Sequence, residues 1–260
     1  MHRLTIRLTS GEPFDVVLRR WTHDPWATGL VRRESAGLTE LAKHDLPVPS
    51  LIATDPTGAE SGVPALLMTA VPGETLLVPD DLHDYVTQLA HVLLRIHELP
   101  AELDPTDPHG YEENADRSWI GDLALRRTAE DAAATTGDSQ QVLVHGDYHQ
   151  LNVLWLGQQL SGVVDWSYTG RGQRGIDVGY CRLTLAVLFS ADAAAQFLCC
   201  YEAESGLRVD PHADIRGLLN FDSDWLDFIP RVVAGRAPVD LAGMAGRVTE
   251  VLQLAAARLD

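Results

Sequence analysis

Lysine is almost absent from this chain of 260 residues, in which Lys43 is the only one and arginine supplies the other fixed positive side chains. Positive charge is scarce overall, since 20 lysines and arginines face 37 aspartates and glutamates, for a formal net charge of −17. Binding to nucleic acid needs a basic face that neutralises phosphates, so we expect no nucleic-acid partner. The acidity either keeps the protein soluble or forms an acidic pocket for a cationic ligand.

Cysteine and long apolar runs are also scarce. The three cysteines, Cys181, Cys199 and Cys200, form neither a paired framework nor a metal-ligand spacing, which favours a reducing, cytoplasmic setting. No apolar run approaches the ~20 residues that a membrane-spanning helix needs. The N-terminal "MHRLTIRLTSGE" alternates polar and apolar residues and lacks the apolar region of a signal peptide. We therefore expect neither membrane insertion nor secretion.

Residues 1–72 have the pattern of a small sheet with one helix. Segments 4–8 and 14–20 alternate with the strand period of two around "TSGEP", which predicts a β-hairpin. The segment "VRRESAGLTELAKHDL" has leucines at helical spacing, and "PVP" ends the predicted helix. The apolar segment 64–71 predicts a further strand, closed by Pro72. We expect these residues to form a β-rich N-terminal lobe.

Residues 73–260 are richer in helical patterns and are expected to form a larger lobe. Apolar runs at 142–144 and 153–155 predict strands, and "LSGVVDWS" predicts another that ends at Asp165. The segment "GRGQRG" is interpreted as a loop, and Asp177 stands where a helix N-cap belongs. Four further helices are predicted: "DDLHDYVTQLAHVLLRIHEL", 118–134, 191–205 and roughly 239–258. The outline is an α+β fold of two lobes.

The segment "VLVHGDYHQLNVLW" inserts a polar loop between two apolar strands. Asp147 and Asn152 lie in this loop five residues apart, and Asp165 ends a nearby strand. The protein-kinase catalytic loop has the same five-residue step from Asp to Asn, followed by a metal-binding Asp. Phosphoryl transfer needs these residue types, because one carboxylate orients and deprotonates a hydroxyl while a carboxylate and an amide hold Mg²⁺.

The ordered set of motifs is more specific than any one of them. "HGDYHQLNVLW" followed by "GVVDWSYTGRGQRGIDVG" resembles the aminoglycoside phosphotransferase and choline kinase-like family. "LPVPSLIATD", "PALLMTAVPGETL" and "LLRIHELP" are similar to family segments in the same order, over roughly residues 4–205. The resemblance implies a two-lobed, protein-kinase-like fold. It also implies an enzyme that moves the γ-phosphate of ATP or GTP, with Mg²⁺, to a hydroxyl of a small molecule such as an aminoglycoside-like or other antibiotic.

The resemblance implies roles for the polar loop. Asp147 is expected to be the catalytic base, and Asn152 and Asp165 the magnesium ligands. His145 is expected to stabilise the loop rather than to act as an acid or base. Asp177 is expected to brace the catalytic loop, to cap its helix, or to do both.

The same resemblance implies roles in the N-terminal lobe. By alternation along "VVLRR", Val17 is expected to face the adenine and Arg19 the phosphates. Glu34 is expected to pair with a basic residue of that strand, although local arginines could instead hold it at the surface. The hinge that hydrogen-bonds the base is expected at Met68, Thr69 and Ala70.

The sequence departs from the family pattern at two places. The phosphate-binding position is usually Lys, but Lys43 comes too late in its helix, so Arg19 is the remaining candidate and nucleotide geometry is expected to differ. The family's first strand and Gly-rich turn should precede the hairpin, but too few residues stand before Leu4. We therefore expect that Met1 is not the natural start.

The acceptor-binding residues carry no readable motif, and the oligomeric state stays open. The segment "DSDWLD" places Asp222, Asp224 and Asp227 around Trp225, which suits an amine-bearing acceptor through ion pairing and cation–π contact. An acidic surface loop is an equal interpretation of the same residues.

Two rival functions remain at this point. The spacing His145-x-Asp147-x-His149 could supply the metal ligands of a hydrolase, because alternate residues of a strand share a face. A degenerate kinase-like protein could bind a nucleotide or a partner without turnover, which the missing Gly-rich turn favours. The intact set of Asp147, Asn152 and Asp165 opposes the second alternative.

Overall fold

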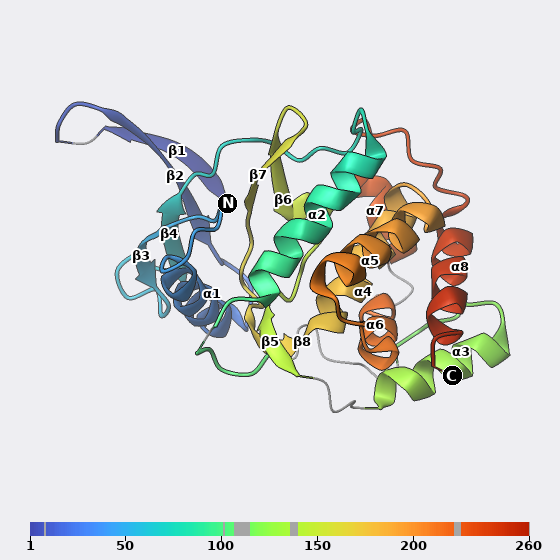
Figure 1. The fold of residues 1–260 in the computed structure, drawn as a ribbon. Coiled ribbons are helices and arrows are strands. Elements are labelled where there is room, and N and C mark those ends of the chain that lie inside the picture. Colours follow the sequence, from blue (N-terminus) through green and yellow to red (C-terminus); the bar gives the residue numbers. More distant parts are fainter. Residues whose placement is uncertain (8, 101, 107–114, 136–139, 221–224, 260) are drawn as a thin grey trace.

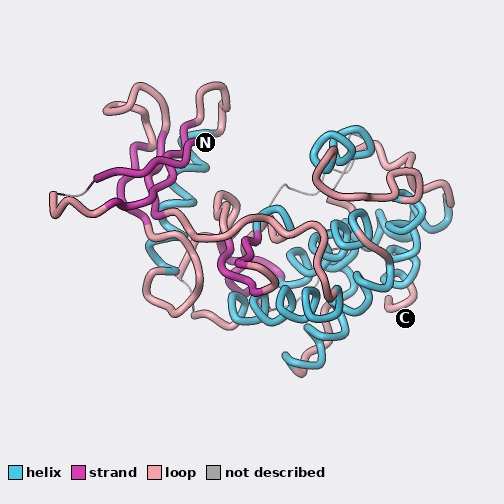
Figure 2. The backbone as a smooth tube through the Cα atoms, turned by 90° about the horizontal axis from the view of Figure 1, so that it is seen from above, coloured by secondary structure: helices cyan, strands magenta, loops and turns pink. Residues whose placement is uncertain are grey.

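The computed structural model describes the whole chain except residues 8, 101, 107–114, 136–139, 221–224 and 260. A small antiparallel sheet with one helix forms one end of the molecule, and a larger helical part forms the other (Figures 1 and 2). This arrangement confirms the predicted α+β fold of a β-rich and a helical lobe. No helix among the described residues is both long enough and apolar enough to cross a bilayer.

The N-terminal lobe is a four-stranded sheet with one packed helix. Its strands, in spatial order, are β1 (His2–Arg7), β2 (Pro13–Arg20), β4 (Ala65–Thr69) and β3 (Leu51–Asp55), and its helix is α1 (Ala27–Leu41). The predicted hairpin, helix and closing strand are confirmed. Strand β3 was not predicted, because its middle residues are exposed and it lacks the alternation of a half-buried strand. Helix α1 contacts β3 and β4 through a buried face that includes Val31, Leu38 and Leu41.

Helices make up most of the second lobe. They are α2 (Leu82–His97), α3 (Leu123–Ala134), α4 (Arg174–Leu188), α5 (Ala191–Ser205), α6 (Pro211–Leu218), α7 (Trp225–Val233) and α8 (Met244–Ala256). Helix α4 is the centre of this lobe, since it packs against α5, α6 and α8. Asp81 caps α2 by accepting from the N–H groups of His83 and Asp84, as expected for an acidic residue at a helix start.

Two short antiparallel pairs of strands support the polar loop. Strand β5 (Gln141–Val144) pairs with β8 (Gly170–Gln173), and β6 (Val153–Leu156) pairs with β7 (Gln159–Val163). The 3₁₀ turn η1 (Gln150–Asn152) joins the loop to β6. The chain therefore enters and leaves the loop through paired strands, which fixes both of its ends.

Two sequence-based expectations about this region were wrong. The segment "GRGQRG", expected as a loop, forms β8 and the first residues of α4. Glycine is required there for space, because a Cβ on Gly170 would lie 2.7 Å from the backbone oxygen of Asp104. Asp177 is not the N-cap of α4: Gln173 holds that position, and Asp177 lies in the first turn with a buried side chain.

Candidate active site

A pocket of about 350 Å³ lies between the sheet and the strands that follow the polar loop. It is lined by seven of the residues that the sequence assigned to nucleotide or metal: Val17, Arg19, Met68, Thr69, Ala70, Asn152 and Asp165. The β2–β4 register places Val17 directly opposite Met68, so both strands contribute to one wall. Val17 therefore meets Asn152, 135 positions later in the chain, in one cavity. The walls of this cavity are mostly apolar, as suits a planar base.

The segment expected to be the hinge already uses two of its backbone donors. The N–H of Thr69 donates to the carbonyl of Ser50 at 2.9 Å, and the N–H of Ala70 donates to the carbonyl of Asp15 at 3.0 Å. A base that binds here must therefore use carbonyl oxygens of this segment or the N–H of Val71, which also lines the pocket.

Arg19 forms the centre of an ion-pair network at the floor of the pocket. Its guanidinium holds Asp165 through two bonds, of 2.5 Å to Oδ1 and 3.0 Å to Oδ2. The same Nη1 lies 3.2 Å from Oε2 of Glu34, which is fully buried. The expected pairing between α1 and β2 is thus present in the structure, and an arginine makes it.

Burial and neighbouring charges both shift the pKa values in this network. Loss of solvation raises the pKa of Glu34, and Asp165 raises it further, while Arg19 acts against both. Burial lowers the pKa of Arg19, but the charges of Glu34 and Asp165 outweigh that effect and the net change is upward. Oγ of Ser167 lies 3.2 Å from Oε2 of Glu34 and 2.9 Å from Oδ1 of Asp165, so its one hydroxyl hydrogen is shared between the two carboxylates. Sequence reasoning missed Ser167, because a lone serine after "DW" carries no recognisable spacing.

Asp165 has a left-handed backbone conformation, with φ of +66°, and is the only described residue other than glycine with a positive φ. This conformation costs on the order of 1 kcal/mol for a residue with a Cβ and tends to occur where a side chain must be aimed at a site. The neighbouring Trp166 is fully buried and donates its Nε1–H to the carbonyl of Val163 at 3.0 Å. The buried indole anchors the turn that directs Asp165 into the pocket.

The polar loop brings Asp147 and Asn152 into contact. Nδ2 of Asn152 donates to the carbonyl oxygen and to Oδ2 of Asp147, both at 2.9 Å. The two amide hydrogens are thereby used, and Oδ1 of Asn152 accepts no hydrogen bond from the described residues. Asn152 therefore has an oxygen available beside Asp165 in the pocket lining.

Two further side chains contact Asp147. Nδ1 of His149 accepts from the N–H of Leu151 at 3.2 Å, which leaves its Nε2 at 3.4 Å from Oδ1 of Asp147. The hydroxyl of Tyr180, on α4, hydrogen-bonds Asp147, and burial, with Asp147 beside it, raises the pKa of Tyr180 well above its usual value. Tyr180 was missed, because one tyrosine in an apolar helix has the pattern of a core residue.

Asp177, on α4, holds the start of the polar loop through two backbone hydrogen bonds. Its Oδ2 accepts from the N–H of His145 at 2.7 Å, and its Oδ1 accepts from the N–H of Gly146 at 2.8 Å. The carboxylate is fully buried, so these two donors and the ring of His97 at 3.2 Å are what compensates its charge. Gly146 has φ of +84°, and a Cβ there would lie 2.4 Å from the carbonyl of Tyr168, so only glycine fits.

His145 is a neutral, structural histidine. Its Nε2 lies 3.0 Å from the carbonyl oxygen of Val164 and must carry the proton, while its Nδ1 accepts from the N–H of Asp147 at 3.1 Å. Burial lowers its pKa, which favours this neutral form. With both ring nitrogens used, His145 has no lone pair for a metal. No group of three potential metal ligands of the His, Cys, Asp or Glu type occurs among the described residues, so the structure does not bring His145, Asp147 and His149 together as a metal site.

The residues suggested for the acceptor are only partly described. Asp222 and Asp224 lie outside the described residues, and Asp227 is exposed in the first turn of α7. Trp225 is 2% exposed and packs edge-on against Trp119, with ring centroids 5.6 Å apart. Its ring therefore belongs to the core, and the expected open aromatic face for a cation is not present at Trp225.

The chain is similar to known proteins in both sequence and fold. The chain matches the model of a phosphotransferase enzyme family over residues 2–210. None of the curated protein sequences matches it. Among solved structures, it is similar to an aminoglycoside-3′-phosphotransferase of type VIII, with 21% identity and a TM-score of 0.59, covering 84% of this chain and 88% of that one.

Two further structures show the same fold. A macrolide 2′-phosphotransferase from Brachybacterium faecium has 20% identity and a TM-score of 0.58, with 99% of this chain and 88% of that chain covered. An aminoglycoside phosphotransferase from Streptomyces rimosus, solved with ADP and streptomycin, has 17% identity and a TM-score of 0.54, with 82% and 92% covered. At these identities the structures establish the fold, and the family model establishes membership. The chain belongs to the phosphotransferase enzyme family.

Proposed function

We propose that this protein transfers the γ-phosphate of ATP or GTP to a hydroxyl group of a small molecule. The observation that carries the proposal is the meeting of Asn152, Asp165 and Arg19 in one pocket with the apolar side chains of Val17 and Met68. One part of the pocket suits a base, and the other suits phosphates and their metal.

The residues present fit a magnesium ion. Mg²⁺ takes oxygen ligands and usually keeps several waters, so it needs only one or two protein groups beside the phosphates. Oδ1 of Asn152 is available, and the carboxylate of Asp165 lines the same pocket. When bound, the metal neutralises charge on the phosphates and orients them. Arg19 contacts both oxygens of the Asp165 carboxylate, so a bound metal would share this carboxylate with the guanidinium.

The chain's own groups divide the remaining work. Arg19 offers a guanidinium that binds phosphate oxygens at two points, as its fork now binds Asp165. Asp147 orients the acceptor hydroxyl and takes its proton, while Asn152, His149 and Tyr180 hold its carboxylate in place. Asp177 fixes the loop backbone through the N–H groups of His145 and Gly146, so little reorganisation is needed during transfer.

The proposed acceptors are hydroxyl-bearing antibiotics of the aminoglycoside and macrolide type. The structures of similar fold include one named for a macrolide and others solved with hygromycin B or streptomycin and ADP. A cytoplasmic setting suits the proposed donors, ATP and GTP. It also suits the three free cysteines, Cys181, Cys199 and Cys200.

A phosphate-transfer screen tests the proposal. Purified protein with Mg²⁺ and either ATP or GTP is incubated with aminoglycosides, macrolides, amino alcohols and sugars, and phosphorylated acceptor is detected by mass spectrometry. We expect at least one acceptor to gain a phosphate, and Asp147→Asn to lose that activity. Equal product with the parent and the variant would overturn the role of Asp147.

A nucleotide-binding protein without turnover is the second candidate. The observation that favours it is the two-point contact of Arg19 with Asp165, which occupies the proposed metal ligand. This candidate predicts nucleotide binding without phosphate transfer to any acceptor and without nucleotide hydrolysis.

A further inference from the structure

Trp21 directly follows strand β2 and contacts the guanidinium group that lines the nucleotide pocket. Arg19 and Trp21 are two positions apart, so their side chains leave the extended chain on the same side. The guanidinium carbon of Arg19 lies over the indole ring, 4.7 Å from its centroid. The N–H of Trp21 donates to the carbonyl of Pro64 at 3.0 Å, and its side chain packs against the core. Backbone and core contacts therefore hold the ring on which the guanidinium lies.

The hydrogen bonds of Arg19 leave one edge of its guanidinium unused. Nη1 uses its two hydrogens for Asp165 and Glu34, and Nη2 uses one hydrogen for Asp165. The Nε–H and the second hydrogen of Nη2 have no acceptor among the described residues, and Nε is accessible to solvent. These two hydrogens lie on the same edge of the planar group. That edge can bind a phosphate through two parallel hydrogen bonds while Asp165 and Glu34 stay paired.

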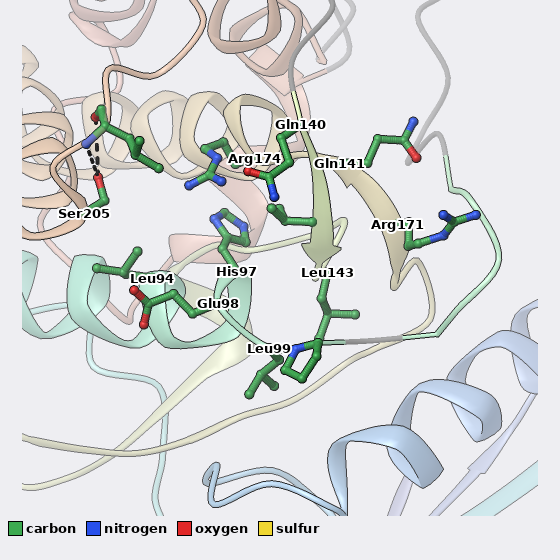
Figure 3. Close-up of a pocket in the computed structure, with 13 residues that line it drawn as sticks. Leu94, His97, Glu98, Leu99, Gln140, Gln141, Leu143, Arg171, Arg174 and Ser205 are labelled. Carbon is green, nitrogen blue, oxygen red and sulfur yellow. Dashed lines mark hydrogen bonds between the residues drawn. The ribbon is translucent and has the colours of Figure 1, made fainter.

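The arginines of a larger cavity, of about 600 Å³ in the helical lobe, are arranged differently (Figure 3). Arg171 and Arg174 line this cavity but lie apart and do not converge on one point. Nε of Arg171 already donates to the carbonyl of Leu103 at 2.7 Å. Neither guanidinium lies over an aromatic ring in the described part of the chain. Of these three arginines, only Arg19 contacts a ring that restricts its orientation.

We propose, on the basis of the proposed function, that Trp21 is a positioning residue for the phosphates of the nucleotide. Contact with the indole restricts rotation of the Arg19 guanidinium, so that one edge keeps Glu34 and Asp165 and the other is presented to a phosphate. Trp21 is not among the residues that line the nucleotide pocket, so its effect passes through Arg19. A planar guanidinium stacks on an aromatic ring as an ammonium group does not, which suits an arginine where the family usually has Lys.

Calorimetric titration of the full chain with MgATP and MgGTP, and with adenosine and guanosine as competitors, tests this role. We expect Trp21→Leu to raise the Kd of the triphosphate that binds by about threefold or more. The Kd of the matching nucleoside, which has no phosphate, should stay within about twofold. Trp21→Phe keeps an aromatic ring and should recover most of the affinity. Trp26→Leu is the matched control, because Trp26 is 77% exposed, and it should change neither Kd.

A double-mutant cycle with Arg19→Gln, measured by urea unfolding without nucleotide, tests the contact itself. We expect the two substitutions to be coupled by a factor of about threefold or more in the unfolding equilibrium constant, because Trp21 loses its cationic partner in Arg19→Gln. An equal effect of Trp21→Leu in the parent and in Arg19→Gln would refute the contact. An unchanged triphosphate Kd in Trp21→Leu, or an equal rise for the nucleoside, would refute the positioning role alone. A parent protein that binds neither triphosphate would overturn the proposed function, and the phosphate role with it.

Discussion

Replacing Asp177 by alanine should destabilise the protein by about 3 kcal/mol or more. The substitution leaves the backbone N–H groups of His145 and Gly146 and the Nε2–H of His97 without their acceptor. All three donors surround a fully buried carboxylate, where water cannot replace it. A buried donor left unpaired costs about 1–3 kcal/mol, so three of them set the lower bound. With a urea m-value of about 3 kcal/mol/M, the unfolding midpoint should fall by about 1 M or more.

Asp122→Ala is the matched control for this measurement. Asp122 also accepts from two backbone N–H groups, those of Ala124 and Leu125, but it is exposed at the start of α3. Water can satisfy both donors after the substitution, so we expect a loss of only about 0.5–2 kcal/mol, as for other helix caps. If both variants lose the same stability within about 0.5 kcal/mol, burial does not determine the effect and the reasoning fails.

Three further predictions concern the helical core and the N-terminal lobe. Arg182 and Asp214 form a buried ion pair, so removing either charge alone should cost about 3–5 kcal/mol in urea unfolding, while replacing both by apolar residues should cost less. Gly179→Ala should destabilise by about 1–3 kcal/mol, because its Cβ would lie 2.1 Å from the backbone oxygen of Asp214, whereas Gly246→Ala meets no atom within 4 Å and should not destabilise. Burial raises the pKa of Glu34, so the stability tied to its protonated form is complete below about pH 4.3 and is lost as pH rises through the folded pKa. The stability of the parent relative to Glu34→Gln should therefore fall as the pH rises above about 4.3 in unfolding titrations, and a rise would contradict the sign.

The sequence predicted those elements whose pattern is local. The alternation around "TSGEP" and the helical spacing in residues 82–97 correspond to β1–β2 and α2. The polar loop could be located because its neighbours are apolar strands, and the structure places Asn152 and Asp165 in one pocket. These features depend on spacing along the chain, which a single sequence displays directly.

Features that depend on tertiary contacts could not be predicted in the same way. Strand β8 consists of glycine and polar residues, and its pairing with β5 and the close approach of residues 104–106 require that composition. Asp177 has the sequence context of an N-cap, but its partners lie 31 and 32 residues earlier in the chain. Tyr180 contacts Asp147 only because the fold packs α4 against the polar loop. No local pattern reports such contacts.

Nucleotide binding with and without Mg²⁺ tests the central claim most directly. Calorimetric titration of ATP and GTP should be carried out on the parent protein, Asp147→Asn and Asp165→Asn, with turnover of any acceptor that the screen finds. We expect Asp165→Asn to lose the Mg²⁺-dependent part of binding. Asp147→Asn should keep its nucleotide Kd within about threefold and lower kcat by ~10²-fold or more, because a base contributes in the transition state. Equal loss of nucleotide affinity in both variants, or parent binding that does not depend on Mg²⁺, would contradict the separate roles of the two carboxylates.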